Sequence, residues 1–85
     1  MNPKKTLEET VDLMLSDNWE DRFKAEYYQL EYRYVALNKS LMEADLSAET
    51  AEQTMNLHYR REQLNNMRMY LLSMKTVAAA EGIEL

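Results

Sequence analysis

The sequence contains no cysteine, a single histidine, one glycine and one proline. Without cysteine there is no disulfide framework and no thiolate ligand for a metal, and His58 alone cannot form a histidine cluster. The glycine and the proline lie near the ends, so neither interrupts a helix in the interior. The longest apolar runs, such as 69–74, are far too short to span a bilayer. These absences predict a helical protein with no metal, no cofactor and no membrane span.

Size and charge narrow the class further. The chain has 85 residues and a net charge of −5. One domain covering 1–85 is expected, and a core this small often needs a partner chain. The negative charge disfavours binding to bulk nucleic acid or to anionic membranes. The N-terminal stretch MNPKKTLEET lacks the apolar core of a signal peptide, so a cytoplasmic location is expected.

Hydrophobic spacing predicts an all-α fold with one short and two long helices. A short helix or arm is expected over 1–16, where Thr6 and Glu9 fit a capping box. A long helix is expected over 19–42, with Ser16 or Asp17 as its cap. Its apolar residues recur at alternating spacings of 4 and 3, typical of a packed helical seam. These residues are Phe23, Tyr27, Leu30, Tyr34, Leu37 and Leu41.

The second half of the chain predicts a partner for that helix. The acidic stretch 43–50 is interpreted as a turn, with Ser47 and Thr50 as possible caps. A long helix is then expected over 51–80, ending near Gly82. Its seam residues are Leu57, Leu64, Met67, Leu71, Met74 and Ala78, and Arg60 occupies one seam position. Two helices of similar length joined by a short turn predict an antiparallel hairpin.

Both long helices carry more apolar surface than one hairpin seam can cover. A second stripe on the first consists of Ala25, Tyr28, Tyr32, Val35 and Met42, and one on the last consists of Met69, Leu72, Thr76 and Ala79. The short first helix can cover part of this surface, and the remainder must meet another chain or a ligand. A homo-oligomer of helical hairpins is the simplest interpretation.

Basic residues outnumber acidic ones in two segments, 22–42 and 57–75, which an antiparallel hairpin brings together. The middle of the hairpin is then basic and rich in tyrosine, although the protein as a whole is acidic. Arginines with tyrosine rings suit a small phosphorylated ligand. They equally suit ordinary salt bridges to Glu26, Glu31 and Glu62, and both interpretations stay open.

Individual polar residues of the last helix add candidates for a site. Arg60 must reach an acid, an anionic ligand or the solvent near the turn, because a buried unpaired guanidinium is very costly. Gln63, Asn66 and Tyr70 share one flank and could form a row of hydrogen-bonding groups or an ordinary polar flank. The sequence has no carboxylate pair, nucleophile triad or phosphate-cradling glycine loop. A non-enzymatic protein is therefore expected.

Two blocks of residues carry a resemblance to known sequences. The block in the first long helix consists of Arg22, Phe23, Ala25, Glu26, Tyr27, Gln29, Leu30, Arg33, Tyr34 and Leu37. The block in the second consists of Arg60 or Arg61, Gln63, Met67, Tyr70 and Leu71, followed by EGIEL at 81–85. In these blocks the sequence resembles a family of small proteins from crAss-like phages and from phages and prophages of Gram-positive bacteria. The likeness spans most of the chain, but the linker and the segment VAAAEGI depart from the family pattern.

The hairpin organisation is also similar to that of phage anti-CBASS sponges, which sequester cyclic oligonucleotide signals in the host bacterial cytoplasm. This resemblance implies an oligomeric, non-enzymatic binder of a cyclic di- or trinucleotide. Arginines for phosphates and tyrosines for bases are then expected among Arg22, Tyr28, Arg33, Arg60, Arg61 and Tyr70. Two alternatives remain: an inhibitor of anti-CRISPR type that binds a host defence protein through its acidic ends, and a purely structural assembly hairpin.

Overall fold

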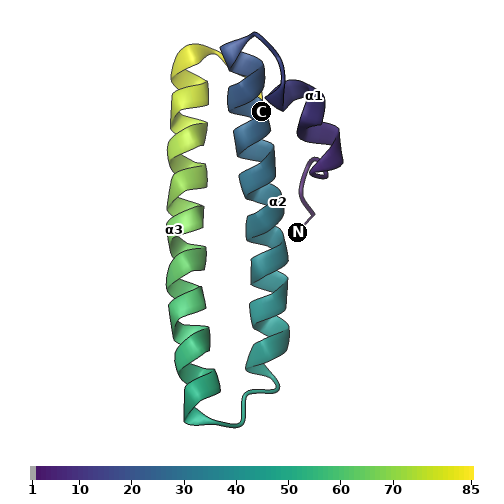
Figure 1. Ribbon diagram of the computed structural model, residues 1–85. Helices are drawn as coiled ribbons and strands as arrows, with labels where there is room; N and C mark the ends of the chain where they lie inside the picture. The colour runs from purple at the N-terminus through teal and green to yellow at the C-terminus, as the bar shows by residue number, and fades with distance from the viewer. Residues whose placement is uncertain (1) are drawn as a thin grey trace.

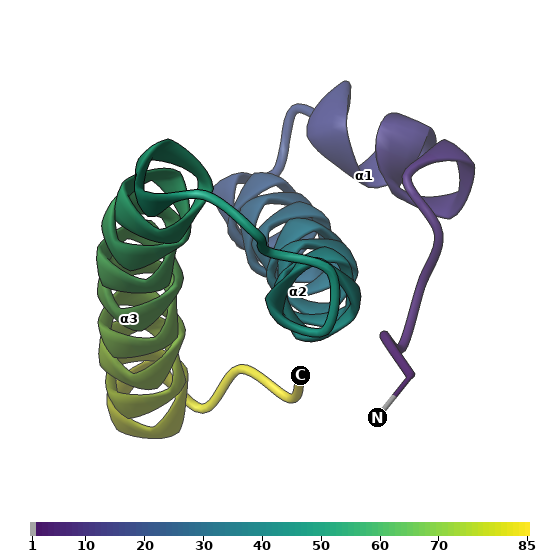
Figure 2. The ribbon, with the colours of Figure 1, turned by 90° about the horizontal axis from the view of Figure 1, so that it is seen from below.

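A computed structural model describes residues 2–85 and shows the expected all-α architecture (Figure 1). The helices follow in the order η1 (Glu8–Thr10), α1 (Val11–Met14), α2 (Trp19–Asp45) and α3 (Ala51–Glu81). The long helices α2 and α3 pack side by side as an antiparallel pair, and the short α1 lies on the other side of α2 (Figures 1 and 2). The molecule is elongated, with extents of 48 × 25 × 20 Å.

Helix α2 begins at Trp19, as expected, but its cap and its end differ from those expected. Its cap is Asn18, whose Oδ1 accepts a hydrogen bond from the Glu20 amide at 2.8 Å, and neither Ser16 nor Asp17 takes this role. The Ser16 hydroxyl instead donates to Asp21 at 2.8 Å. The helix continues to Asp45, beyond the predicted end at residue 42. Nothing in the stretch after residue 42 breaks a helix, because it contains neither glycine nor proline.

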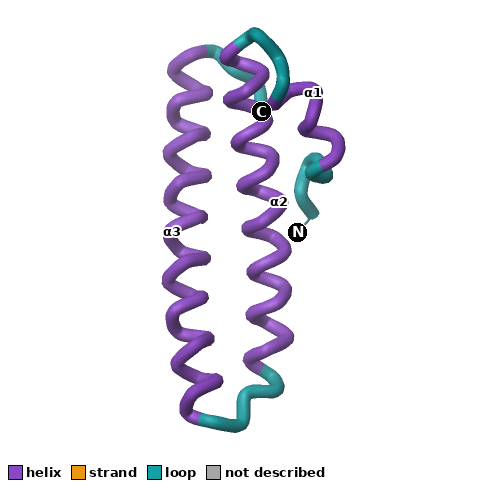
Figure 3. The backbone as a smooth tube through the Cα atoms, viewed as in Figure 1, coloured by secondary structure: helices purple, strands orange, loops and turns teal. Residues whose placement is uncertain are grey.

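The connection between the long helices and both ends of α3 follow local signals in the sequence. Thr50 caps α3 through a complete capping box with Gln53, in which the Gln53 amide donates to the Thr50 hydroxyl at 3.1 Å. At the other end Gly82 takes the left-handed conformation with φ 71°, as the predicted C-terminal position requires. Figure 3 shows the loop between α2 and α3 at one end of the hairpin.

The N-terminal segment docks on α2 through a buried polar contact. The predicted pairing of Thr6 with Glu9 is present, with the Thr6 amide donating to the Glu9 carboxylate at 3.1 Å. Thr10, which is fully buried, donates its hydroxyl to the Leu7 carbonyl at 2.6 Å and accepts from the Gln29 amide at 3.0 Å. Because its hydroxyl is satisfied twice, Thr10 can be buried without a large desolvation cost.

The core follows the predicted seam and also takes in part of the second stripe of α2. Tyr27, Leu71 and Met74 are buried between α2 and α3, and the seam residues Phe23, Leu30 and Tyr34 pack against them. Tyr28 belongs to the second stripe of α2, but it is only 7% exposed and is part of the core cluster of Tyr27, Leu71 and Met74. Leu13 of α1 packs against this cluster, and Lys5 lies 5.5 Å from the centre of the Tyr28 ring. The N-terminal segment thus covers part of the second stripe of α2.

The two ends of the described chain meet over α2. The Lys4 amide donates to Glu31 of α2 at 2.8 Å, and the Lys4 ammonium donates to the carbonyl of Leu85 at 2.6 Å. Figure 2 shows the C-terminal segment crossing from α3 past α2 toward the N-terminal segment. None of the described helices is both long enough and apolar enough to cross a bilayer.

Candidate functional site

The structure does not gather the predicted ligand-binding residues into one site. Arg22 lies near the start of α2, where its guanidinium donates to the Ser16 carbonyl at 2.8 Å and holds the connection between α1 and α2. Arg61 forms an ion pair with Asp45 beside the turn at the opposite end of the hairpin. Tyr28 is buried against the N-terminal segment and offers no free ring face for stacking. These three residues are committed to contacts within the chain.

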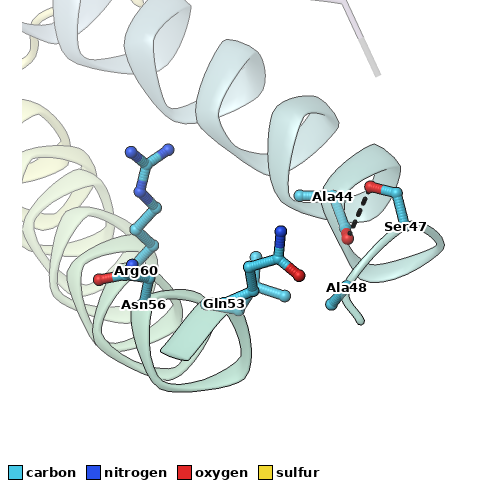
Figure 4. A pocket seen from close by; sticks show the side chains of 7 residues that line it. Ala44, Ser47, Ala48, Gln53, Asn56 and Arg60 are labelled. Carbon is cyan, nitrogen blue, oxygen red and sulfur yellow. Dashed lines mark hydrogen bonds between the residues drawn. The ribbon is translucent and has the colours of Figure 1, made fainter. Parts of the chain in front are cut away.

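Arg60 lies near the turn, which is one of the places expected for it. It is exposed and lines a pocket of about 190 Å³ between the end of α2 and the start of α3. Figure 4 shows Gln53 between Arg60 and the turn residues Ser47 and Ala48. The Ser47 hydroxyl donates to the Ala44 carbonyl at 3.2 Å. Among the described residues that line this pocket, Arg60 alone carries a formal charge, and the other polar side chains are those of Ser47, Gln53 and Asn56.

The remaining two candidates, Arg33 and Tyr70, line one groove between α2 and α3. The part of the groove next to Arg33 has a volume of about 170 Å³ and is bounded by Glu26, Gln29 and Leu30. A continuation of about 410 Å³ shares Leu30 and Tyr70 with it. The α3 residues that line this continuation are Tyr59, Glu62, Gln63, Asn66, Met67 and Tyr70. The predicted flank of Gln63, Asn66 and Tyr70 therefore faces a single groove.

Two acids lie in the groove, and both have partners. The Tyr70 hydroxyl donates a hydrogen bond to the Glu26 carboxylate, and this bond with the Glu26 charge raises the pKa of Tyr70. Glu62 lies 3.2 Å from the exposed His58, with which it forms an ion pair when the imidazole is protonated. The predicted salt bridges from arginine to Glu26, Glu31 and Glu62 are not seen within residues 2–85.

Arg33 differs from the other candidates in the groove. Among the described residues it is exposed and makes neither an ion pair nor a side-chain hydrogen bond, although it lies close to Glu26 and Tyr70. A guanidinium without a protein partner is available to an anion from solution. Arg33, Tyr70 and the amides of Gln63 and Asn66 together can contact phosphate, a flat ring and hydrogen-bonding edges.

Sequence reasoning missed Tyr59 and Gln29 as members of this groove. Tyr59 is 58% exposed and lines the same continuation as Gln63, to which it is related by four positions on α3. That spacing could have placed it on the flank. Gln29 lies four positions before Arg33 on α2 and lines the same part of the groove, so the same spacing could have placed it there. Across residues 2–85, no group of three or more histidine or acidic side chains is arranged to hold a metal ion.

Comparison with known proteins leaves the groove to be interpreted from its own chemistry. No protein-family model, curated protein or solved structure matches this chain.

Proposed function

We propose that the chain binds a cyclic di- or trinucleotide in the groove between α2 and α3 and holds it without cleaving it. The observation that carries this proposal is the placement of Arg33, with no partner among residues 2–85, on the same groove as Tyr70. The planar guanidinium forms paired hydrogen bonds with a phosphate, and a tyrosine ring stacks on a base.

The neighbouring side chains suit the remaining parts of such a ligand. Gln63 and Asn66 each offer an amide donor and acceptor, and both line the continuation of the groove. Side-chain amides hydrogen-bond the edges of unpaired bases. The Tyr70 ring is 49% exposed, so one part of it is open to stacking while its hydroxyl is held by Glu26. That hydrogen bond fixes the ring orientation before a ligand arrives, which lowers the entropy cost of binding.

The biological setting of the proposal comes from the resemblance to phage proteins. In that setting the chain acts in the cytoplasm of the host bacterium, as a homo-oligomer that removes a cyclic nucleotide immune signal by stoichiometric binding. The groove residues Arg33, Gln63, Asn66 and Tyr70 support binding rather than turnover, because none of them is an activated nucleophile or a general base.

Native mass spectrometry with a panel of cyclic di- and trinucleotides tests the proposal. The wild-type protein is expected to gain an integral number of ligands, and Arg33→Ala is expected to lose most of this binding. Arg61→Ala is a matched control, because it removes the same charge from an exposed position outside the Arg33 groove. The proposal fails if no member of the panel binds, or if Arg61→Ala reduces binding as much as Arg33→Ala.

Direct binding of a host defence protein is a second candidate, and unpaired acids at both ends of the hairpin favour it. Asp12, Asp17 and Glu20 lie near α1, and Glu43, Glu49 and Glu52 lie near the turn. All are exposed, and none takes part in an ion pair among residues 2–85. Such carboxylates can imitate a phosphate backbone. This function predicts a stoichiometric protein complex that survives Arg33→Ala and is weakened when these acids are replaced by amides.

A further inference from the structure

One side of α3 is left uncovered by the hairpin and carries a row of exposed residues, part of which also lines the edge of the groove between α2 and α3. Its residues alternate at spacings of 4 and 3 over most of the helix, and all are exposed. We call this row the outer seam, which consists of Met55, Tyr59, Glu62, Asn66, Met69, Ser73, Thr76 and Ala80. Positions at these spacings lie along one side of a helix, so a second helix can contact all of them along its length.

The outer seam is open and unusually poor in charge. Neither η1 nor α1 contacts α3, and Figure 2 shows α1 on the far side of α2. Glu62 is the only residue of the seam with a full charge at pH 7. Met55, Tyr59 and Met69 are each more than half exposed, at 53%, 58% and 53%. Because solvent-facing sides of helices normally carry many charges, this composition is typical of a surface that another helix covers.

We propose that a second copy of the chain covers the outer seam, with its own α3 packed antiparallel to the first. A symmetric pair of this kind uses the same surface on both chains, so that surface must be complementary to itself. In an antiparallel pair of helices each a position of one heptad faces a d position of the other. In one alignment every residue of the outer seam therefore faces another residue of the outer seam on the second copy.

The apolar positions of this alignment pair large residues with small ones. Met55 faces Ala80 of the second copy, and Tyr59 faces Thr76 of the second copy. The large residues occur toward the start of the seam and the small ones toward its end, so antiparallel packing fills the space evenly. The Thr76 hydroxyl already donates to the Leu72 carbonyl of its own helix at 3.1 Å. Thr76 therefore adds no unsatisfied polar group to the contact.

The charged residue of the outer seam meets a polar residue in this alignment. Glu62 faces Ser73 of the second copy, whose hydroxyl can donate to the carboxylate. Asn66 faces Met69 of the second copy near the centre of the pair. A parallel arrangement would instead place Glu62 beside Glu62, and like charges in direct contact are destabilising. The charge pattern thus favours the antiparallel orientation when a second copy is the occupant.

The length of the outer seam is adequate for a specific contact. From Met55 to Ala80 it extends about 37 Å at the helical rise of ~1.5 Å per residue. A contact of this length buries on the order of 1,000 Å² in total, near the lower limit for specific interfaces. Tyr59 and Asn66 also line the groove of Arg33, so the second copy would form a wall at its open edge. The proposal itself does not require a nucleotide.

The first test is the mass of the full chain in solution, measured by sedimentation equilibrium. The expected mass is a multiple of the 10.1 kDa chain that contains this dimer. Ser73→Glu sets a new carboxylate against Glu62 of the other chain at two symmetric places in the pair and is expected to raise the dissociation constant roughly 100-fold. Combining it with Glu62→Lys creates opposite charges there and is expected to restore the dimer. Both positions are exposed, so the helical fold should survive.

Cysteine pairing tests the alignment itself, and the absence of native cysteine makes it direct. A mixture of Tyr59→Cys and Thr76→Cys chains is expected to form a disulfide-linked dimer, because facing seam positions meet the Cα separation of ~4–7 Å. A mixture of Met55→Cys and Glu62→Cys chains is the control. It should not form a disulfide-linked dimer, since these two positions lie far apart in the pair. The proposal is overturned by a monomer at all concentrations, or by an oligomer that Ser73→Glu does not weaken.

The two proposals can fail separately. If the dimer forms and no nucleotide binds, the outer seam stands and the nucleotide function is lost. If nucleotides bind a chain whose mass is unaffected by Ser73→Glu, the function stands and the outer seam is not the interface. Capture of a different helical protein by a monomeric chain would also overturn the second copy as the occupant.

Discussion

The side-chain amide of Gln29 on α2 donates a hydrogen bond to the hydroxyl of Thr10 at 3.0 Å, and Thr10 is fully buried. The same amide nitrogen lies 3.5 Å from the sulfur of Met14. This contact is a buried polar link between the N-terminal segment and α2, beside the exposed hydrogen bond from the Lys4 amide to Glu31. It keeps that segment over Tyr28, which would otherwise be an exposed ring.

Thr10→Val tests this link, because it removes the hydroxyl while keeping the shape of the side chain. The Gln29 amide then loses its acceptor, and the free energy of unfolding is expected to fall by about 1–3 kcal/mol. Urea unfolding at a fixed protein concentration measures it. Thr54→Val is the matched control, since the exposed Thr54 hydroxyl bonds only to the Thr50 carbonyl one turn earlier. An equal loss in both variants would contradict the assigned role of Thr10.

Gly82→Ala tests the end of α3. Gly82 has φ 71°, where a Cβ is strained, although no heavy atom lies within 4 Å of the place it would occupy. The expected loss of about 1 kcal/mol in unfolding free energy is therefore conformational rather than steric. Gly82→Asn should lose less, because asparagine tolerates this conformation better than alanine. Thermal unfolding of both variants compares them, and equal stability of Gly82→Ala and wild type would count against the left-handed end.

Met74→Ala tests the core between α2 and α3. Met74 is only 3% exposed, and its truncation is expected to lower the unfolding free energy by about 2–5 kcal/mol. Met42→Ala makes the same chemical change at a position that is 64% exposed, and its effect should be below about 0.5 kcal/mol. Chemical denaturation of the two variants measures the difference. Similar losses would mean that Met74 is not in the core.

Alkaline pH should weaken the fold through Tyr27. Burial, with the charge and hydrogen bond of Glu31, raises the pKa of Tyr27 from 10.0 to about 12. The folded state therefore favours the protonated phenol of Tyr27. The contribution of this phenol to the free energy of unfolding is complete below pH 10 and is lost as the pH rises toward 12.

Urea unfolding between pH 9 and pH 12 of wild type and Tyr27→Phe measures this contribution. The phenylalanine variant is expected to lose less stability over that interval, because it has no phenol to ionise. A Tyr27→Phe curve parallel to wild type would show that Tyr27 does not titrate in this way.

Much of the fold was predictable because its signals are local. The seam that includes Tyr27 depends only on spacing along one helix, and the capping box of Thr50 with Gln53 depends on neighbouring residues. The end of α2 was predicted too early, because no helix breaker marks it and acidic composition alone is a weak signal. The cap at Asn18 was missed because several neighbouring residues have suitable side chains.

The candidate site was less predictable, since it depends on which side of the hairpin each residue faces. The sequence placed Arg22, Arg33, Arg60 and Arg61 in two adjacent basic segments. The structure separates them along the length of the hairpin, because Arg22 lies at one end while Arg60 and Arg61 lie beside the turn at the other. Only Arg33 and Tyr70 of the predicted set share a groove. Arg22 and Arg61 instead hold the two ends of the hairpin.

The sequence by itself determined the helical class, the pairing of two long helices and the surplus of apolar surface, because periodicity and caps are properties of neighbouring residues. Only the tertiary structure decided how that surplus is divided. The N-terminal segment docks on α2 through Thr10 and Gln29 and buries Tyr28, while the outer face of α3 stays open. That outcome rests on contacts between residues far apart in the chain, which spacing along one helix does not encode.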